Sequence, residues 1–345
     1  MSRRIVILTE GNTNPRTAKT ASCMLRYRPE EVVALLDSTQ AGKTTQEVLG
    51  TGGSTPIVGS LNEIPAANML LLGIAPPGGR IPKSWRSIVL EAIGRGWHIM
   101  AGLHEFLTED PEFTAAAAVK GVNLIDVRKN DEKDVAKGLG LREACLRVLT
   151  VGHDCSVGKM VTSVEVTQGL QRRGKDAHFV ATGQTGIMVS GDGVPIDRVI
   201  ADFASGGIEK VILRQQHHDI LIVEGQGSLV HPSFSGVTLS LLHGTAPHAL
   251  IMCYQAGHDH IFGAEHLAIP PLRKIIELNE TMASIFRPCP VIGIAINSRT
   301  LSDVEAAAER QRVKAEFGLP ACDPVRHGPD ELVDAILAFH AKRSV

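Results

Sequence analysis

The pattern of residues 146–162 is that of a strand, a glycine loop and the start of a helix in direct succession. Few folds contain this succession. The apolar run 146–151 predicts a buried strand that ends at Gly152, and a helical pattern follows Lys159. The N–H groups of the first helical turn then point out of the loop, the helix dipole favours an anion, and the lysine adds a positive charge. The segment therefore predicts a phosphate-binding loop; a tight turn with a surface lysine is the alternative.

The spacing within this loop differs from that of the usual phosphate loop, G-x-x-x-x-G-K-[ST]. Five residues separate Gly152 from Gly158, and Met160 stands where a Ser or Thr would bind magnesium. We expect the phosphates of a cofactor to contact the whole loop. Its residues are Gly152, His153, Asp154, Cys155, Ser156, Val157, Gly158, Lys159 and Met160.

The loop resembles the G-T-D-x-x-V-G-K-T sequence of dethiobiotin synthetase and its relatives, which has the same spacing. His153 replaces the first threonine of that sequence, and Met160 replaces the threonine that binds magnesium. The resemblance implies that phosphate binding is retained, whereas the loss of the second threonine counts against ATP hydrolysis. The matching positions are Gly152, Asp154, Val157, Gly158 and Lys159.

Length, charge and cysteine content exclude several classes of protein. With 345 residues, 43% of them hydrophobic, the chain can form two domains with substantial cores. The net charge of -2 and the scattered basic residues indicate neither nucleic acid nor a membrane as partner, and no apolar run could cross a bilayer. Six dispersed cysteines without a C-x-x-C pair indicate free thiols in the cytoplasm. We expect a cytoplasmic protein that acts on small molecules, and a homo-oligomer.

Residues 1–130 predict a Rossmann-like parallel α/β domain, because strand-like runs alternate with helical patterns. The strand-like runs are 5–8, 32–36, 69–74, 98–101 and 122–126. After the third run, residues 78–83 could hold an anion through Arg80, with a plain turn as the alternative. The mixed charges of residues 129–137 predict a linker or, alternatively, the start of a solvated helix.

Residues 141–345 predict a second α/β domain, of the P-loop NTPase-like type, around the phosphate loop. The helix at 196–213 is expected to break near Ser205-Gly206-Gly207, and Ser302 is expected to cap the helix that follows it. Further strands are expected at 178–181, 219–223, 250–253 and 291–295, and further helices at 302–317 and 330–340.

A second motif, Val223-Glu-Gly-Gln-Gly-Ser228, follows a predicted strand. Its carboxylate, Glu224, can hold a metal ion or orient an amine, and the two glycines let the backbone approach a ligand closely. The motif resembles the V-E-G-A-G segment of the dethiobiotin synthetase group, in which the glutamate is a magnesium ligand. A capped strand end is the alternative.

Other polar residues near the predicted strand ends are candidates for the same site. We interpret Gln184, Thr185 and Gln226 as substrate-binding residues, and His231 as the general base beside Glu224. In P-loop relatives an asparagine after the late strand reads the purine base, and Asn297 has this position; a turn residue is the alternative.

One cysteine and two histidines could add further chemistry. Cys155 lies near a helix N-terminus, which lowers a thiol pKa, so it could carry an acyl group or merely fill the loop. His258 and His260 could bind a metal ion, but the sequence shows no clear third ligand for them.

The loop, the segments 181–188 and 191–197 and the Glu224 motif together resemble the DgcN-type family, which is associated with N-acetylation of D-glutamate. The resemblance covers nearly the whole chain and is most specific in residues 150–230. It implies a P-loop protein that uses acetyl-CoA and a D-amino acid and consumes no ATP. Composition and periodicity alone predict only two α/β domains with a phosphate loop.

Coenzyme A carries a pyrophosphate and a 3′-phosphate on adenosine, which a phosphate loop and Asn297 could hold. Acetylation of an amine needs a base and donors for the oxyanion but no magnesium, so Met160 is compatible with it. The acceptor amino acid stays open. The candidates for binding its carboxylates are Arg80, Arg214 and Arg273.

Two other functions also stay open. An ATP-dependent, carboxylate-activating ligase of the dethiobiotin synthetase type would hold magnesium with Asp154 and Glu224. The other function is that of a non-enzymatic, nucleotide-dependent switch or chaperone, because some P-loop relatives are metallochaperones. Against it, the sequence shows no Cys/His metal cluster. Magnesium-dependent ATP turnover would distinguish the ligase from the acetyltransferase.

Overall fold

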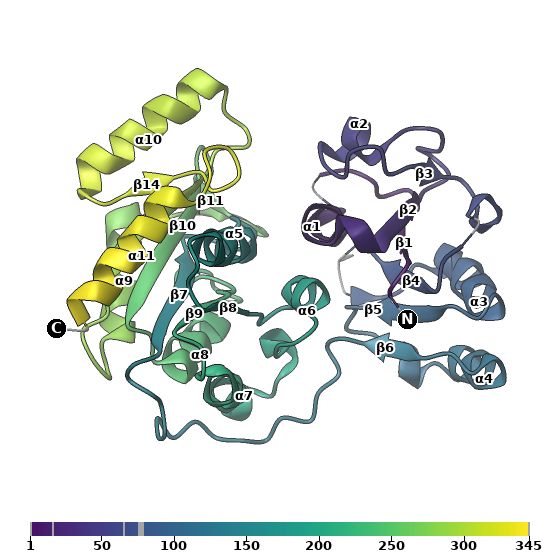
Figure 1. The fold of residues 1–345 in the computed structure, drawn as a ribbon, viewed down its shortest axis with the longest axis horizontal. Helices are drawn as coiled ribbons and strands as arrows, with labels where there is room; N and C mark the ends of the chain where they lie inside the picture. Colours follow the sequence, from purple (N-terminus) through teal and green to yellow (C-terminus); the bar gives the residue numbers. More distant parts are fainter. Residues whose placement is uncertain (1, 16, 65, 75–78, 344–345) are drawn as a thin grey trace. The chain divides into compact units, whose positions relative to one another are not determined.

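The chain folds into two compact units (Figure 1), and the computed structural model describes residues 2–15, 17–64, 66–74 and 79–343. The first unit consists of residues 1–129 with 187–191, and the second of residues 130–186 and 192–345. Each contains a six-stranded sheet whose neighbouring strands all run parallel. The α/β class predicted from the sequence is therefore confirmed.

The sheet of the first unit has the strand order β3-β2-β1-β4-β5-β6, which is the order of a doubly wound Rossmann sheet. Every strand-like run predicted in this region contains a strand, and β3 is an additional short edge strand. The strands are β1 (Ile5–Leu8), β2 (Val32–Leu36), β3 (Ile57–Val58), β4 (Met69–Leu72), β5 (His98–Ala101) and β6 (Leu124–Asp126). The helices are α1 (Lys19–Tyr27), α2 (Thr45–Leu49), α3 (Arg86–Gly94) and α4 (Pro111–Lys120).

Alternate side chains of β1 enter two hydrophobic cores, one on each face of this sheet. Val6 and Leu8 pack in a cluster with side chains of α3, whereas Ile5 and Ile7 pack in a cluster with Met24 of α1. Successive side chains of a strand point to opposite faces. A strand covered on both faces is therefore aliphatic throughout, as β1 is.

The sheet of the second unit has the order β14-β13-β10-β7-β9-β8, with β7 in its middle between β10 and β9 (Figure 1). The loop after β7 therefore leaves the carboxyl edge of the sheet at its centre. The strands are β7 (Leu146–Gly152), β8 (Ala177–Val180), β9 (Ile220–Val223), β10 (Ala249–Gln255), β13 (Val291–Asn297) and β14 (Ala321–Cys322). The helices are α5 (Lys159–Arg172), α7 (Ala201–Gln215), α8 (Ser235–Thr245), α9 (Leu272–Ala283), α10 (Asp303–Phe317) and α11 (Asp330–Arg343). Helix α6 (Gln184–Ser190) begins in this unit, and its residues from 187 onwards belong to the first unit.

A small antiparallel hairpin, β11 (His260–Ile261) and β12 (Ala264–Ala268), follows β10 and belongs to neither sheet. The predicted cap of α10 is confirmed, because the Ser302 side chain accepts the N–H of Glu305 while the Glu305 carboxylate accepts the N–H of Ser302.

Helix α7 runs without interruption through Gly206-Gly207, so the predicted break there is wrong. The glycines serve close packing instead. A Cβ atom on Gly206 would lie 1.8 Å from the carbonyl oxygen of Asp134, and one on Gly244 of α8 would lie 1.9 Å from Ile208. Gly206 thus lets α7 approach the segment around Asp134, and Gly244 lets α8 approach α7.

The region predicted as a linker forms no helix or strand and lies along α7 in the second unit. The backbone N–H groups of Lys137, at its end, and of Gly138, the next residue, donate to the buried carboxylate of Glu209, at 3.0 and 2.6 Å. Lys210 pairs with Glu132 at 3.1 Å. The segment is therefore held in place although it has no regular structure.

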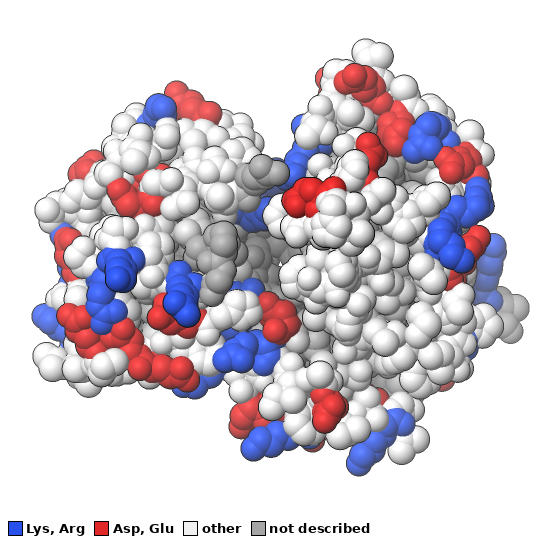
Figure 2. All heavy atoms as spheres, turned by 180° about the vertical axis from the view of Figure 1, so that it is seen from behind, with Lys and Arg blue, Asp and Glu red and all other residues white. Residues whose placement is uncertain are grey.

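Charged side chains of both signs are interspersed over the face shown in Figure 2. Several form surface ion pairs, such as that between Arg86 and Asp110 at 2.6 Å and that between Arg214 and Asp192, also at 2.6 Å. Exposed pairs of this kind contribute little to stability. Among the helices of the described residues, none combines the length and the apolar character needed to cross a membrane.

Candidate active site

The phosphate loop occupies the predicted place, between the end of β7 and the start of α5. Gly158 precedes the first residue of α5 and has a φ of 111°, which a residue with a side chain rarely adopts. Ser156 has a φ of 60° and is one of the two non-glycine residues described with positive φ. Such backbone conformations cluster at ligand-binding loops, which agrees with the predicted role of this segment.

Lys159 is buried beneath the loop rather than exposed on it, so the surface lysine of the alternative interpretation is not present. Its Nζ donates to the carbonyl oxygen of Asp154 at 2.7 Å, and burial lowers its pKa. A Cβ atom on Gly152 would lie 2.9 Å from this Nζ. A glycine at this position therefore leaves room for the ammonium group, which has three N–H donors and can also bind an anion that enters the loop.

Asp154 is completely buried, and its carboxylate is held from several sides. Oδ1 accepts the N–H of Cys155 at 2.6 Å, while Oδ2 accepts the N–H of Phe262 at 2.7 Å and lies 2.7 Å from Nε2 of His258. Burial by itself would raise the pKa of Asp154, but the hydrogen bonds from His258, Phe262 and Cys155 together lower it. The result is an ionised carboxylate that orients the His258 ring.

Glu224 lies directly after β9, the strand next to β7, and is buried. Its Oε2 accepts the N–H groups of Thr182 and Gly183, at 2.8 and 3.1 Å, and its Oε1 takes part in neither bond. Burial raises the pKa of Glu224 to about 7 despite these bonds. A carboxyl group with this pKa can accept and release a proton near neutral pH.

The residues predicted to bind the substrate start a helix beside Glu224 instead of forming a loop. Gln184 is the first residue of α6 and is buried, and Thr185 follows it half-buried. The Gln226 amide donates to the carbonyl oxygen of Thr182. Gln226 thus holds in place Thr182, whose N–H group donates to Glu224. This contact of Gln226 positions other residues of the protein.

His231 is buried, and both of its ring nitrogens are engaged. Nδ1 accepts the N–H of Ser233 at 3.1 Å, so Nε2 carries the proton and donates it to the carbonyl oxygen of Phe262 at 3.0 Å. Neither nitrogen is open to a substrate proton in this geometry, which counts against the general-base role assigned to His231 from the sequence.

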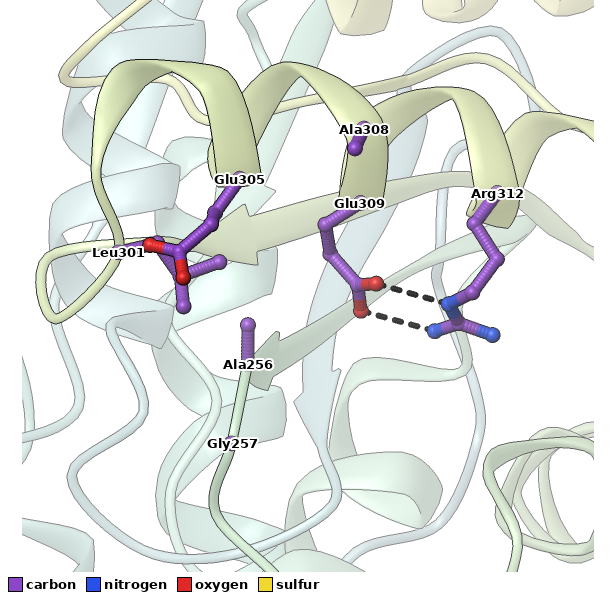
Figure 3. Close-up of a pocket in the computed structure, with 7 residues that line it drawn as sticks. All are labelled: Ala256, Gly257, Leu301, Glu305, Ala308, Glu309 and Arg312. Carbon is purple, nitrogen blue, oxygen red and sulfur yellow. Dashed lines mark hydrogen bonds and ion pairs between the residues drawn. The ribbon is translucent and has the colours of Figure 1, made fainter.

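Asn297 ends β13 and contacts the phosphate loop. Its side-chain amide donates to the carbonyl oxygen of Val157 at 3.2 Å, and its backbone oxygen accepts the N–H of Ala256 at 3.1 Å. Beyond this contact lies a pocket of about 410 Å³ between the end of β10 and α10 (Figure 3). The pocket is lined by Ala256, Gly257, Leu301, Glu305, Ala308, Glu309 and Arg312.

Tyr254 connects the phosphate loop with this pocket. Its ring packs edge-on against that of His153, with 5.9 Å between the ring centroids, and its hydroxyl donates to Glu309 at 2.6 Å. Tyr254 thus packs between a residue of the loop and a residue that lines the pocket.

No metal was assigned from the sequence, and only the ligase alternative gives Asp154 and Glu224 to magnesium. Among the described residues, the side chains that could share an ion with Asp154 are Cys155 and His231, with the ligand atoms within 4.8 Å of one another. The sequence showed no Cys/His metal cluster, whereas the fold brings one thiol and one imidazole together with the Asp154 carboxylate. Residue 231 is too distant in sequence from the loop for spacing to show the cluster.

The arginine candidates for substrate carboxylates are scattered. Arg214 lies near the end of α7, just before β9 begins, at the edge of the sheet opposite the loop, and it pairs with Asp192. Arg273 donates to the carbonyl oxygen of Glu316. Arg80 is exposed in the first unit, and residue 78 of its predicted anion-binding segment, 78–83, lies outside the described residues.

A Rossmann-type sheet followed by a sheet with a central phosphate loop defines a two-domain protein with a Rossmann-like domain and a P-loop domain. Comparison with known families agrees: residues 38–130 match the Rossmann-like domain and residues 134–333 the P-loop domain of DUF1611, described as a domain of unknown function. The protein belongs to the DUF1611 family.

Two relatives carry the name D-glutamate N-acetyltransferase. One, from Tritonibacter scottomollicae, is 37% identical over 323 residues, which cover 93% of this chain and 94% of the relative. The other, from a Pseudoalteromonas species, is 41% identical over 270 residues, which cover 77% of this chain and 80% of the relative. These names confirm the family resemblance drawn from the loop and the Glu224 motif.

A crystal structure of a DUF1611 family protein from Anabaena variabilis has the same fold. It is 40% identical in sequence, covers 97% of this chain and 99% of its own, and superposes with a TM-score of 0.92. The two-unit architecture is therefore shared within the family.

Proposed function

We propose that this protein is an acyltransferase that moves an acetyl group from acetyl-CoA to the amine of D-glutamate. The observation that carries the proposal is Glu224, a buried carboxyl group with a pKa raised to about 7, beside a phosphate loop on the neighbouring strand. The names of two relatives that match most of the chain support the same reaction.

We assign the coenzyme to the loop and the adjoining pocket. The pyrophosphate would contact the N–H groups at the start of α5 and the ammonium group of Lys159. The adenosine would fill the pocket beyond Asn297, where Glu305 and Glu309 can accept hydrogen bonds from its hydroxyl or amino groups and Arg312 can attract a phosphate (Figure 3). Bound in this way, the coenzyme supplies the activated acetyl group.

Glu224 is the proposed proton acceptor. An amine must lose a proton to attack a thioester, and a base whose pKa lies near the working pH removes it most effectively. Oε1 of Glu224 is the atom that would take this proton, while the bonds from Thr182 and Gly183 fix Oε2. Gln184 and Thr185, at the start of α6 beside it, remain the proposed substrate-binding residues.

The alternative with ATP and magnesium fits the residues less well. Met160 has no hydroxyl group to complete a magnesium site. The possible ligands nearest the Asp154 carboxylate are a thiol and an imidazole, whereas magnesium binds oxygen ligands. We therefore favour a reaction without phosphoryl transfer.

The proposal is tested with purified enzyme, acetyl-CoA and D-glutamate in the presence of EDTA and without ATP. We expect release of the coenzyme A thiol and formation of N-acetyl-D-glutamate, and a panel of D- and L-amino acids would define the acceptor. A reaction that requires ATP and magnesium and yields ADP and phosphate would reject the proposal in favour of the ligase.

We propose a cytoplasmic location, which the six dispersed cysteines without a C-x-x-C pair support. The expected homo-oligomer stays a prediction, which light scattering of the purified protein tests.

A further inference from the structure

The mouth of the phosphate loop contains three side chains of the kind that bind transition metals. A carboxylate oxygen of Asp154, the sulfur of Cys155 and a ring nitrogen of His231 all lie within 4.8 Å of one another. Asp154 and His231 are buried, and Cys155 is partly exposed. In the proposed acetyl transfer these three side chains have no joint role as ligands of a metal ion.

The hydrogen bonds of Asp154 leave one side of its carboxylate open towards His231. A carboxylate oxygen can accept about two hydrogen bonds. Oδ2 already faces two donors, His258 and the N–H of Phe262, whereas Oδ1 has the N–H of Cys155. Oδ1 lies 4.0 Å from Nε2 of His231, too far for a hydrogen bond. Two metal–ligand bonds of about 2.0–2.2 Å can span this gap, and a small approach of the two side chains brings the atoms to the shorter separation that a tetrahedral ion requires.

Two further histidines surround this group. His258 donates to the far oxygen of the same carboxylate, as residues outside a metal's ligand shell commonly do to orient a ligand. His153 is buried with neither ring nitrogen in a hydrogen bond of normal geometry among the described residues, although the Gln255 backbone is close. Its ring centroid lies 5.6 Å from that of His258. A buried polar group without such a bond points to a partner that completes the site.

We propose that Asp154, Cys155 and His231 bind one divalent transition-metal ion of the zinc class, with the fourth position open to water or a ligand. Sulfur and nitrogen donors select zinc or cobalt over magnesium. Three protein ligands with one open position are the arrangement of zinc sites that exchange ligands. The proposal does not rest on the acetyl transfer.

Binding of the ion rearranges protons in a defined way. The Cys155 thiol releases its proton to solvent, because the thiolate is the ligand. The His231 proton moves from Nε2 to Nδ1, so the contacts with Phe262 and Ser233 are given up when Nε2 binds the metal. The ligand set is therefore formed only when the ion is present.

Cobalt tests the proposal, because a thiolate bound to Co²⁺ produces a charge-transfer absorption band. EDTA-treated, full-length protein is titrated with Co²⁺ after the chelator is removed. We expect the band to saturate at one equivalent, to disappear on addition of one equivalent of Zn²⁺ and to persist in excess Mg²⁺. Absence of the band in the wild-type protein would overturn the proposal.

Variants show whether the ion binds at this site. Cys155→Ser should lose the band, whereas Cys23→Ser, which changes a partly exposed cysteine of the first unit, should keep it. His258→Ala should keep the band but require at least tenfold more Co²⁺, because it removes an orienting bond and no ligand. A band that persists in Cys155→Ser, in a variant with wild-type circular dichroism, would place the ion elsewhere and reject the site.

Discussion

Individual residues of the site differ from their sequence-based roles mainly because they are buried. Lys159 is enclosed beneath its loop, and Glu224 holds a proton more tightly than an exposed glutamate does. His231 is held by Ser233 and Phe262. Burial of a charged group shifts its protonation and limits its partners, and neither effect can be read from residue type alone.

Lys159→Ala is expected to weaken acetyl-CoA binding about ten- to hundredfold, because a hydrogen bond to a charged group contributes roughly 1.5–3 kcal/mol. Isothermal titration calorimetry measures the change. Lys175→Ala, which removes an exposed lysine after α5, is the matched control and should bind as the wild type does. An unchanged dissociation constant in Lys159→Ala would contradict the phosphate-loop assignment.

The raised pKa of Glu224 predicts a pH-dependent stability. The unfolded chain loses this proton near its ordinary value of 4.5, but the folded protein keeps it up to about 7. Between these pH values the folded state binds more protons, so the free energy of unfolding falls as pH rises, by at most about 1.4 kcal/mol per pH unit. Urea unfolding at several pH values in this range gives the free energy of unfolding, which should fall less steeply with pH in Glu224→Gln than in the wild type. An equal fall in both proteins would argue that the carboxyl group is not buried.

Glu224→Gln is also expected to lower kcat about a hundredfold or more with little effect on acetyl-CoA binding, because a general base acts on the transition state. In the wild type, kcat should rise with pH through about 7, the pKa of Glu224. The variant should lose this rise. If it kept full activity, the base would lie elsewhere, and His258, oriented by Asp154, would be the next candidate.

Among the structural elements, helix α7 departs most clearly from the sequence-based expectation. Local propensity predicts that two adjacent glycines break a helix. Here the loss in helix propensity is offset by close packing, since the backbone of Asp134 and Val135 occupies the space that a side chain at Gly206 would need. The hairpin β11–β12 was also not predicted; its paired segments are short, and β12 is mostly exposed.

Gly206→Ala is expected to destabilise the protein by roughly 1–3 kcal/mol, although alanine favours a helix, because its Cβ atom would lie 1.8 Å from the Asp134 carbonyl oxygen. Gly94→Ala, in α3, is the matched control, since a Cβ atom there meets nothing within 4 Å. It should be neutral or stabilising by up to about 1 kcal/mol. Urea unfolding of both variants checks the difference, and a stabilising Gly206→Ala would exclude tight packing at α7.

At the scale of the whole molecule, two parallel sheets with aliphatic cores account for the unusual composition. Only 4% of the residues are aromatic, and each sheet has a hydrophobic cluster on both faces, formed largely by Ile, Leu and Val. Strands that are covered on both sides need this composition. In the second sheet, the strand order places β7 beside β9, so that the loop and Glu224 emerge next to each other.

The sequence by itself determined the α/β class, most strand positions, the position of the phosphate loop and the position of Glu224 directly after a strand. These features depend on local signals: apolar runs, glycine spacing and the alternation of strands and helices. Relative strand order, the burial of Lys159 and the pKa of Glu224 depend on contacts between distant segments. The bond between His258 and Asp154 joins residues 104 positions apart. Only the tertiary structure could bring these side chains together, because no local pattern records which loops meet at the edge of a sheet.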